Sequence, residues 1–431
     1  MKKQISARER FRAVFEHNTA ELDRLPMLSL GTPPQGLFFQ EWEKMIDSDQ
    51  VPDDFVRLTY FGDMTMKKFI CSEWENISLN WPSGFTSVPL PEDHPLWGPY
   101  DKSKVKITIG PHGTITAVGP RMHNVDYSWY LDGYFCRQKQ ADGTILEPHE
   151  VRERFYEKYG KPWDDKFAPN EGQKKHFKEC LKWYEQNYNN FSESGFSDFT
   201  LMCSVGGLFE AVWEGMGSGQ PTVSIMTRKY PGQLQAWLHD VKEWVMKNVK
   251  LQFEMAEEVD AQIDFMWFWD DSGQKGRSLI NPELHRKYWV PLYKEVTDYI
   301  HKKGGFSIIH SCGYGESLLE NWIEGGIDAW QTIERAALND PARIREKVKN
   351  KLIMIGAVDA SNVVSFAESL EEIDEHVKNT MRDAVYTQQD ACYIPGFTHD
   401  LLDPPVRNVR AAVDAMKNYG TLDSLKTLKK N

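Results

Sequence analysis

The chain has 431 residues and a formal net charge of −12, from 63 acidic and 51 basic side chains, and this acidic balance argues against a nucleic-acid-binding protein, which normally presents a basic face. No run of about 18 apolar residues is present, so no membrane span is expected. The six cysteines follow no framework spacing and no apolar signal core follows the N-terminus, so we expect reduced thiols in a cytoplasmic protein.

The first predicted elements are a short amphipathic helix at residues 6–17 and a strand at residues 24–30. The stretch from about residue 96 to residue 190 differs in character from the rest of the chain. It combines a predicted β-hairpin, residues 105–109 and 113–118 around Gly110-Pro111-His112, with a charged and aromatic helical segment at 147–188. We interpret this stretch as an insertion in a larger domain.

Strand-like and helix-like segments alternate through the C-terminal half. The predicted strands are residues 262–269, 306–312, 328–334, 351–358 and 391–397, and the predicted helices are residues 282–303, 316–324, 341–349, 370–385 and about 406–419. Asn281-Pro282 marks a helix start and Gly304-Gly305 the end of the same helix. This alternation predicts a parallel sheet.

The predicted fold is therefore α/β. Several strand–helix units in succession favour a TIM (β/α)8 barrel, formed by residues 1–431 as one domain with the insertion on its rim. A doubly wound open sheet is the alternative.

Reactive groups of a TIM barrel lie at the C-terminal ends of its strands. The predicted strand ends carry a series of polar residues, namely Asp270, Asp271, His310, Cys312, Gln331, Glu334, Asp359 and His399. Nitrogen, sulfur and oxygen ligands from distant segments are thus expected to converge at one end of the barrel.

His310 and Cys312 are the most informative pair in this series. Side chains two residues apart point to the same side of an extended segment, and imidazole and thiolate both suit zinc. With His399 they would form a three-ligand site with an open fourth position, as catalytic zinc requires. Glu334 is a candidate fourth ligand or a partner of the ligands, and Asp270 and Asp271 are the candidate catalytic residues.

Each candidate also has a purely structural interpretation. His310 and Cys312 can be core residues, His399-Asp400 a loop pair, Asp270-Asp271 a cap, and Glu334 a partner of Arg335. Cys392 falls inside a predicted strand, and we interpret it as a packing residue.

Several stretches match a known family. They are residues 7–14, 23–26 and 405–412, Trp269-Asp270-Asp271-Ser272-Gly273, Asn281-Pro282-Glu283-Leu284, Ile309-His310-Ser311-Cys312-Gly313, Glu324-Gly325-Gly326-Ile327-Asp328-Ala329-Trp330-Gln331 and Ile355-Gly356-Ala357-Val358-Asp359. In these stretches the chain resembles the uroporphyrinogen decarboxylase superfamily, and within it the zinc- and cobalamin-dependent methyltransferases. The His-x-Cys-Gly motif is similar to the zinc motif of the methyltransferases and not to that of the decarboxylases.

Two departures from the family pattern affect the functional prediction. The decarboxylases bind porphyrinogen carboxylates with an arginine-containing motif after the first strand, whereas Met27-Leu28-Ser29-Leu30-Gly31-Thr32-Pro33 has no arginine. The methyltransferases often supply a final cysteine ligand after the last strand, where this chain has His399. Tetrapyrrole decarboxylation is therefore disfavoured, and a zinc ligand is retained.

The resemblance implies a zinc-dependent methyltransferase. It would move a methyl group between a small methyl donor and the cobalamin of a corrinoid protein. The long insertion and the abundant aromatic residues favour O-demethylation of a methoxylated aromatic over methylation of a thiol acceptor. One alternative is a metal-independent decarboxylase or lyase that uses Asp270, Asp271 and His399 as acids and bases. Another is a protein that binds a corrinoid or a small molecule without turnover.

Overall fold

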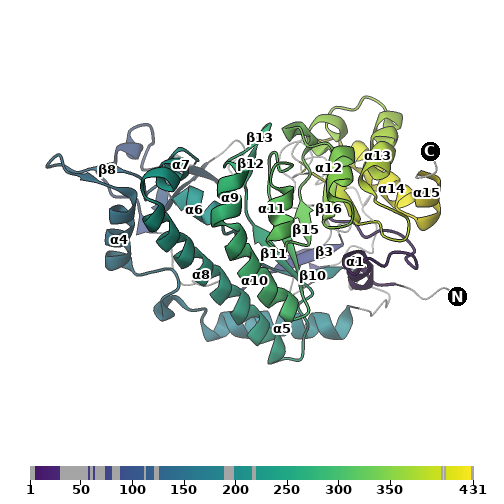
Figure 1. Ribbon diagram of the computed structural model, residues 1–431, viewed down its shortest axis with the longest axis horizontal. Helices are drawn as coiled ribbons and strands as arrows, with labels where there is room; N and C mark the ends of the chain where they lie inside the picture. The colour runs from purple at the N-terminus through teal and green to yellow at the C-terminus, as the bar shows by residue number, and fades with distance from the viewer. Residues whose placement is uncertain are drawn as a thin grey trace.

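The computed structural model describes residues 5–29, 57–58, 62–63, 73–79, 88–110, 113–120, 126–188, 199–215, 220–398, 401 and 404–428. A curled seven-stranded sheet lies at its centre, in the order β17-β16-β15-β14-β11-β10-β3 (Figure 1). The strands are β3 (Trp74–Ile77), β10 (Thr200–Gly206), β11 (Phe265–Trp269), β14 (Phe306–His310), β15 (Ala329–Gln331), β16 (Ile353–Val358) and β17 (Tyr393–Phe397). All neighbours in this sheet pair in parallel.

An extended segment near the N-terminus joins the two edges of the sheet. The Leu28 N–H donates to the carbonyl of Pro395 in β17 at 3.0 Å, and Met27 accepts from the N–H of Glu73, just before β3, at 2.9 Å. The segment thus occupies the position of the predicted strand at residues 24–30, although its described residues form no regular strand. With it the sheet forms the predicted TIM barrel.

Helices cover the outside of the barrel (Figure 1). They are α1 (Ala7–Phe15), α6 (Glu210–Gly215), α7 (Gln220–Lys229), α8 (Pro231–Glu257), α9 (Pro282–Tyr288), α10 (Val290–Lys302), α11 (Leu319–Glu324), α12 (Pro341–Val348), α13 (Leu370–Ala384), α14 (Val406–Tyr419) and α15 (Leu422–Leu428). In α13 the buried Ile373, Val377 and Met381 recur every four residues, so one face of this helix packs on the barrel. None of the described helices has both the length and the hydropathy needed to cross a bilayer.

The predicted helix at residues 282–303 is two helices. α9 ends at Tyr288 and α10 begins at Val290, with Trp289 between them. Pro291 explains the break, because proline donates no backbone hydrogen bond and restricts the residue before it.

The predicted strands are shorter in the structure, and two strands escaped prediction. β14 ends at His310 rather than at Cys312, and β15 ends at Gln331 rather than at Glu334. β14 goes no further because the N–H of Cys312 donates to the Asp271 carboxylate, at 2.7 Å, instead of to a neighbouring strand. β3 and β10 had no clear sequence signal.

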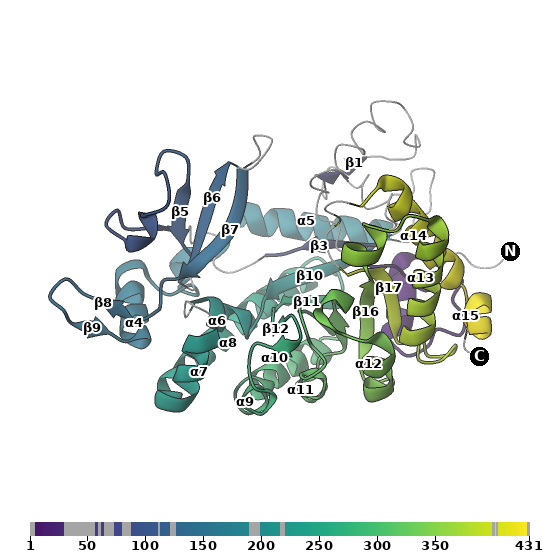
Figure 2. The ribbon, with the colours of Figure 1, turned by 90° about the horizontal axis from the view of Figure 1, so that it is seen from above.

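The stretch predicted as an insertion contributes to a second, antiparallel sheet, which begins at Val88, before the predicted bound near residue 96. This sheet lies on one side of the barrel, opposite α1 and α15 (Figure 2). Its strands are β4 (Val88–Pro89), β5 (Lys106–Ile109), β6 (Thr114–Pro120) and β7 (Asp126–Gly133), and the helices of the stretch are α4 (Pro148–Tyr159) and α5 (Glu171–Asn187). β5 and β6 pair as the predicted hairpin, whereas Pro111 and His112 lie outside the described residues. Phe135 packs against Phe155 of α4 and Trp237 of α8, with ring centroids 5.1 and 5.7 Å apart, so aromatic contacts attach the insertion to the barrel.

Short elements complete the described chain. They are β1 (Arg57–Leu58) with β2 (Gly62–Asp63), β8 (Gln138–Lys139) with β9 (Ile145–Leu146), β12 (Gly273–Gln274) with β13 (Arg277–Ser278), the 3-10 helices η1 (Pro95–Trp97), η2 (Asp165–Phe167) and η3 (Arg335–Ala337), and the π-helical turn η4 (Ala360–Val364). The β12–β13 hairpin follows β11 directly, so it lies at the end of the barrel where the polar residues gather.

Candidate metal centre

Asp271, His310 and Cys312 converge at the C-terminal end of the barrel. The Cys312 Sγ lies 3.3 Å from the His310 Nε2, and the same nitrogen lies 3.7 Å from the Asp271 Oδ1. One ligand atom from each residue lies within 4.8 Å of the other two. Thiolate, imidazole and carboxylate are the ligands that zinc takes in proteins, so this set fits a zinc ion.

Gln331 orients the imidazole of His310. The two residues are paired in register across β14 and β15, and the Gln331 Oε1 accepts a hydrogen bond from the His310 Nδ1. An amide oxygen can only accept, so the proton sits on Nδ1 and the lone pair of Nε2 faces Cys312. Metal-binding histidines are commonly oriented in this way.

Acidic groups surround the thiol of Cys312. Burial, followed by the negative charges of Asp271 and Glu334, raises the pKa of this thiol well above its ordinary value. The Asp271 Oδ1 also accepts the backbone N–H of Cys312 at 2.7 Å. A divalent cation would offset this excess of negative charge, which is a second reason why the residues fit a metal.

Glu334 and Gly313 shape the turn that follows the thiol. The Glu334 Oε2 accepts the Gly313 N–H at 2.6 Å. Gly313 has φ +78°, and a Cβ at this position would lie 2.3 Å from the carbonyl carbon of Gly273. Glu334 therefore positions the turn around Cys312, and its role as a fourth ligand stays a prediction.

Asp270 is fully buried and supports a loop. Its two oxygens accept four hydrogen bonds, from the N–H groups of Leu208, Phe209 and Glu210 at 3.0, 2.9 and 2.7 Å and from the hydroxyl of Tyr293. Burial raises the pKa of Asp270 to about 6. This geometry shows that Asp270 positions the loop after β10, and its catalytic role stays a prediction.

Two sequence candidates remain, His399 and Asp359. His399 lies outside the described residues, so its predicted ligand role stays a prediction. Asp359 caps η4, because its Oδ1 accepts the N–H of Asn362 at 2.9 Å and its own N–H donates to the Nε2 of His376 at 3.0 Å. The structure thus brings together Asp271, His310 and Cys312, and leaves Asp359 in a structural position.

The sequence analysis did not identify a wall of three tryptophan rings beside His310, here called the aromatic wall and formed by Trp74, Trp267 and Trp269. The rings of Trp267 and Trp269 lie 5.9 and 5.0 Å from the imidazole, and Trp74 stacks on Trp267 at 5.0 Å. Trp269 is 37% exposed, so part of its surface is open to a ligand. Alternation along β11 was an available signal, because residues 267 and 269 share one face of the strand.

Glu210 is the other missed residue. Its Oε2 accepts the backbone N–H of Asp271 at 3.0 Å, and the indole of Trp213 donates to the carbonyl of Asp271 at 2.8 Å. These contacts fix the backbone of Asp271 to the segment that follows β10. The glycine pair Gly206-Gly207 marks this loop in the sequence.

Known proteins resemble this chain in sequence over the C-terminal part of the barrel and in fold over most of the chain. The model of the uroporphyrinogen decarboxylase (URO-D) family matches residues 198–419, just over half of the chain. The methyltransferase from Methanosarcina mazei has the same fold, with a TM-score of 0.56, 11% identity and coverage of 96% of this chain and 99% of that chain. A B12-independent methionine synthase from Shewanella sp. W3-18-1 reaches a TM-score of 0.41 at 11% identity, over 94% of this chain and 98% of that chain. A search of curated proteins found no match.

Proposed function

We propose that this chain, which belongs to the uroporphyrinogen decarboxylase (URO-D) family, is a zinc-dependent methyltransferase. It passes a methyl group from a small methyl donor to the cobalamin of a corrinoid protein. The observation that carries the proposal is the convergence of Asp271, His310 and Cys312 at the end of the barrel where reactive groups lie. Asp271 takes part as a ligand here, in addition to the ligands expected from the sequence.

The zinc would be held by the Cys312 thiolate, the His310 imidazole and the Asp271 carboxylate. When bound, it supplies Lewis acidity for the heteroatom that gives up the methyl group. Gln331 keeps the His310 ring in the tautomer that presents Nε2 to the ligand cluster. Glu334 and Glu210 hold the backbone on the two sides of the site through Gly313 and Asp271.

The aromatic wall favours a flat, apolar donor. Trp269 presents exposed ring surface 5.0 Å from the His310 ring, and aromatic faces bind aromatic ligands by offset stacking. A methoxylated aromatic compound, demethylated at oxygen, fits this wall. Of the two adjacent aspartates, only Asp271 is accessible enough to contact such a substrate, since its side chain is 33% exposed and Asp270 is fully buried.

The metal-independent decarboxylase is less well supported. Its acid–base chemistry would use Asp270, whose oxygens already accept four hydrogen bonds inside the protein. Met27 and Leu28, after which a decarboxylase would bind porphyrinogen carboxylates, are buried, and no arginine follows them up to residue 33.

The test combines metal analysis with methyl transfer. Native protein purified without a His-tag and Cys312→Ser are compared for zinc by mass spectrometry, and for methylcobalamin formed from cob(I)alamin and a panel of methoxylated aromatics. We expect Cys312→Ser to lose one equivalent of zinc and at least about 10–100-fold in transfer rate, since losing even a partner of a metal ligand typically costs that much.

Cys180→Ser is the matched control, because Cys180 is also a free thiol, more buried than Cys312, and lies in α5 of the insertion. It should keep both zinc and activity. Equal zinc content in the native protein and Cys312→Ser, or full transfer by Cys312→Ser, would contradict the proposed mechanism.

A further inference from the structure

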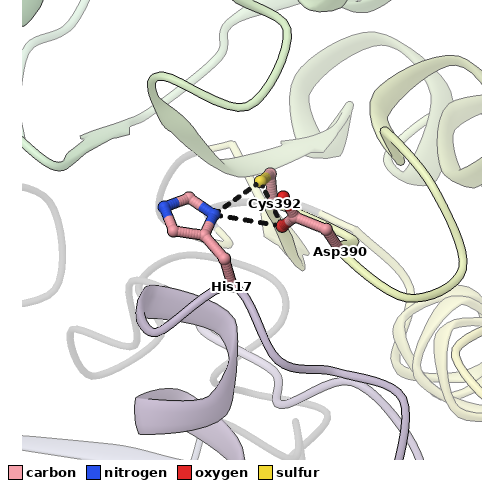
Figure 3. A group of neighbouring side chains, drawn as sticks. All are labelled: His17, Asp390 and Cys392. Carbon is pink, nitrogen blue, oxygen red and sulfur yellow. Dashed lines mark hydrogen bonds and ion pairs between the residues drawn. The ribbon is translucent and has the colours of Figure 1, made fainter.

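A second group of potential metal ligands lies at the opposite end of the barrel. It consists of His17, just after α1, together with Asp390 and Cys392, just before β17 (Figure 3). Because the barrel strands are parallel, the start of β17 and the end of β14 lie at opposite ends of the sheet. This group is therefore separate from the site at His310 and Cys312.

The three side chains point at one another (Figure 3). The Cys392 Sγ lies 3.3 Å from the His17 Nδ1 and 2.7 Å from the Asp390 Oδ1, and the His17 Nδ1 lies 3.1 Å from the same oxygen. Ligand atoms around a tetrahedral zinc ion lie roughly 3.3–3.6 Å apart, as follows from its bond lengths. Small outward rotations of the side chains, less than about 1 Å at the Asp390 oxygen, would therefore admit the ion.

Backbone contacts tie the two segments together before any ion binds. The Thr19 N–H donates to the carbonyl of Gln389 at 3.0 Å, and the Thr19 hydroxyl accepts the N–H of Ala391 at 3.1 Å. His17 and Cys392 both have left-handed backbones, with φ of +58° and +48°. Such conformations are uncommon for residues other than glycine, and here they belong to two of the three residues that meet.

We propose that His17, Asp390 and Cys392 form a structural zinc site that clamps the N-terminal segment to the last barrel strand. Imidazole, carboxylate and thiolate supply three ligands, and the thiol proton passes to solvent when the ion binds. His17 is 44% exposed on its side chain whereas Cys392 is buried, so the ion enters from the His17 side and water completes its coordination. Arg345 does not compete for the thiolate, because its guanidinium donates to the backbone carbonyls of Cys392, Ala384 and Lys349.

The position of the site explains what the ion would do. His17 precedes the segment at Met27 and Leu28 that closes the barrel, and Cys392 precedes the strand on which this segment pairs. An ion bound by both residues would link the N-terminal closing segment to β17, the last strand of the barrel. Residues at the N-terminal end of a TIM barrel typically contribute to stability rather than to catalysis.

The experiment uses full-length Cys312→Ser protein, so that the first site cannot contribute. Its zinc content is measured after dialysis, and cobalt(II) is added to the zinc-free protein to detect thiolate-to-cobalt charge-transfer absorption. We expect one equivalent of zinc, the charge-transfer band, and a melting temperature that rises by several degrees with zinc. Adding His17→Gln, a change at a half-exposed side chain, should abolish the zinc-dependent rise and weaken cobalt binding at least tenfold.

His176→Gln is the matched control, because His176 also contacts a cysteine, with its Nε2 3.6 Å from the Cys180 Sγ, but without a carboxylate in the group. It should leave the zinc content and the rise in melting temperature unchanged. The proposal is overturned if Cys312→Ser protein shows neither zinc nor the cobalt band, or if His17→Gln leaves both intact. These outcomes do not depend on the methyltransferase proposal, whose zinc is already removed.

Discussion

At the scale of single residues, Asp270 and Asp271 show how neighbours in sequence take different roles. Asp270 is fully buried and holds the loop after β10, whereas Asp271 faces His310 and Cys312. Successive side chains of an extended segment point to opposite sides, so the sequence indicates that the two differ. Which one faces the site depends on Glu210 and its loop, about sixty positions earlier in the chain.

The positioning role of Asp270 leads to a prediction for Tyr293→Phe. This change removes one hydrogen bond to a buried carboxyl, so we expect the free energy of unfolding to fall by about 1–3 kcal/mol. Zinc content should stay at the native level, because Tyr293 contacts no proposed ligand. Urea unfolding and metal analysis measure both quantities.

Asp270→Asn provides the comparison for Tyr293→Phe. An amide has one acceptor oxygen in place of two, so Asp270→Asn should destabilise the protein more than Tyr293→Phe does. A fully stable Asp270→Asn protein with lost methyl transfer would instead indicate a catalytic Asp270.

The close approach of His310 to Cys312 was predictable because their spacing in the sequence is local. The contacts of Cys392 were not. It was interpreted as a packing residue inside a strand, but it lies one residue before β17 and contacts His17 and Asp390. Only the folded chain brings His17 to this position, so no local pattern could reveal the contact.

At the scale of elements, strand order was predictable and strand ends were not. The five C-terminal strands and the helices between them follow from alternating hydrophobic segments and from start and stop signals such as Asn281-Pro282. β14 ends early because a loop from elsewhere takes the backbone group that would continue its ladder, as the Asp271 carboxylate does with the N–H of Cys312. β3 and β10 escaped prediction because one has only four residues and the other follows a polar stretch.

The turn after β14 is the element that presents the thiol, and Gly313→Ala tests it. Gly313 has φ +78°, and an added Cβ would lie 2.3 Å from the Gly273 carbonyl carbon. Both effects oppose alanine, so the turn should shift and move Cys312 away from His310. We expect at least a tenfold loss of zinc affinity at this site, measured by competition with a chromogenic chelator.

Gly143→Ala is the control for Gly313→Ala. Gly143 also has a positive φ, of +86°, but nothing lies within 4 Å of an added Cβ. It should cost about 1 kcal/mol of stability through its backbone alone and leave zinc binding unchanged. Equal zinc affinities in the two variants would show that the turn does not position the thiol.

At the scale of the whole molecule, the barrel carries a group of possible metal ligands at each end. The C-terminal end carries Asp271, His310 and Cys312, and the N-terminal end carries His17, Asp390 and Cys392. The chain reaches both ends because residues near its start complete a sheet whose last strand comes from residues near 395. Closure of the barrel therefore depends on contacts between segments far apart in the chain, such as the Phe397 N–H that donates to the Ser29 hydroxyl, 368 positions away.

Gly396→Ala tests this closure. A Cβ at Gly396 in β17 would lie 1.6 Å from the carbonyl oxygen of Leu28, so alanine cannot be accommodated unless the closing segment moves. Because that backbone is buried and hydrogen-bonded on both sides, we expect a loss of more than about 3 kcal/mol in the free energy of unfolding. Gly232→Ala in α8, where nothing lies within 4 Å of the added Cβ, should be neutral or slightly stabilising. If urea denaturation gave both variants the native midpoint, the segment at Leu28 would not be the eighth member of the barrel.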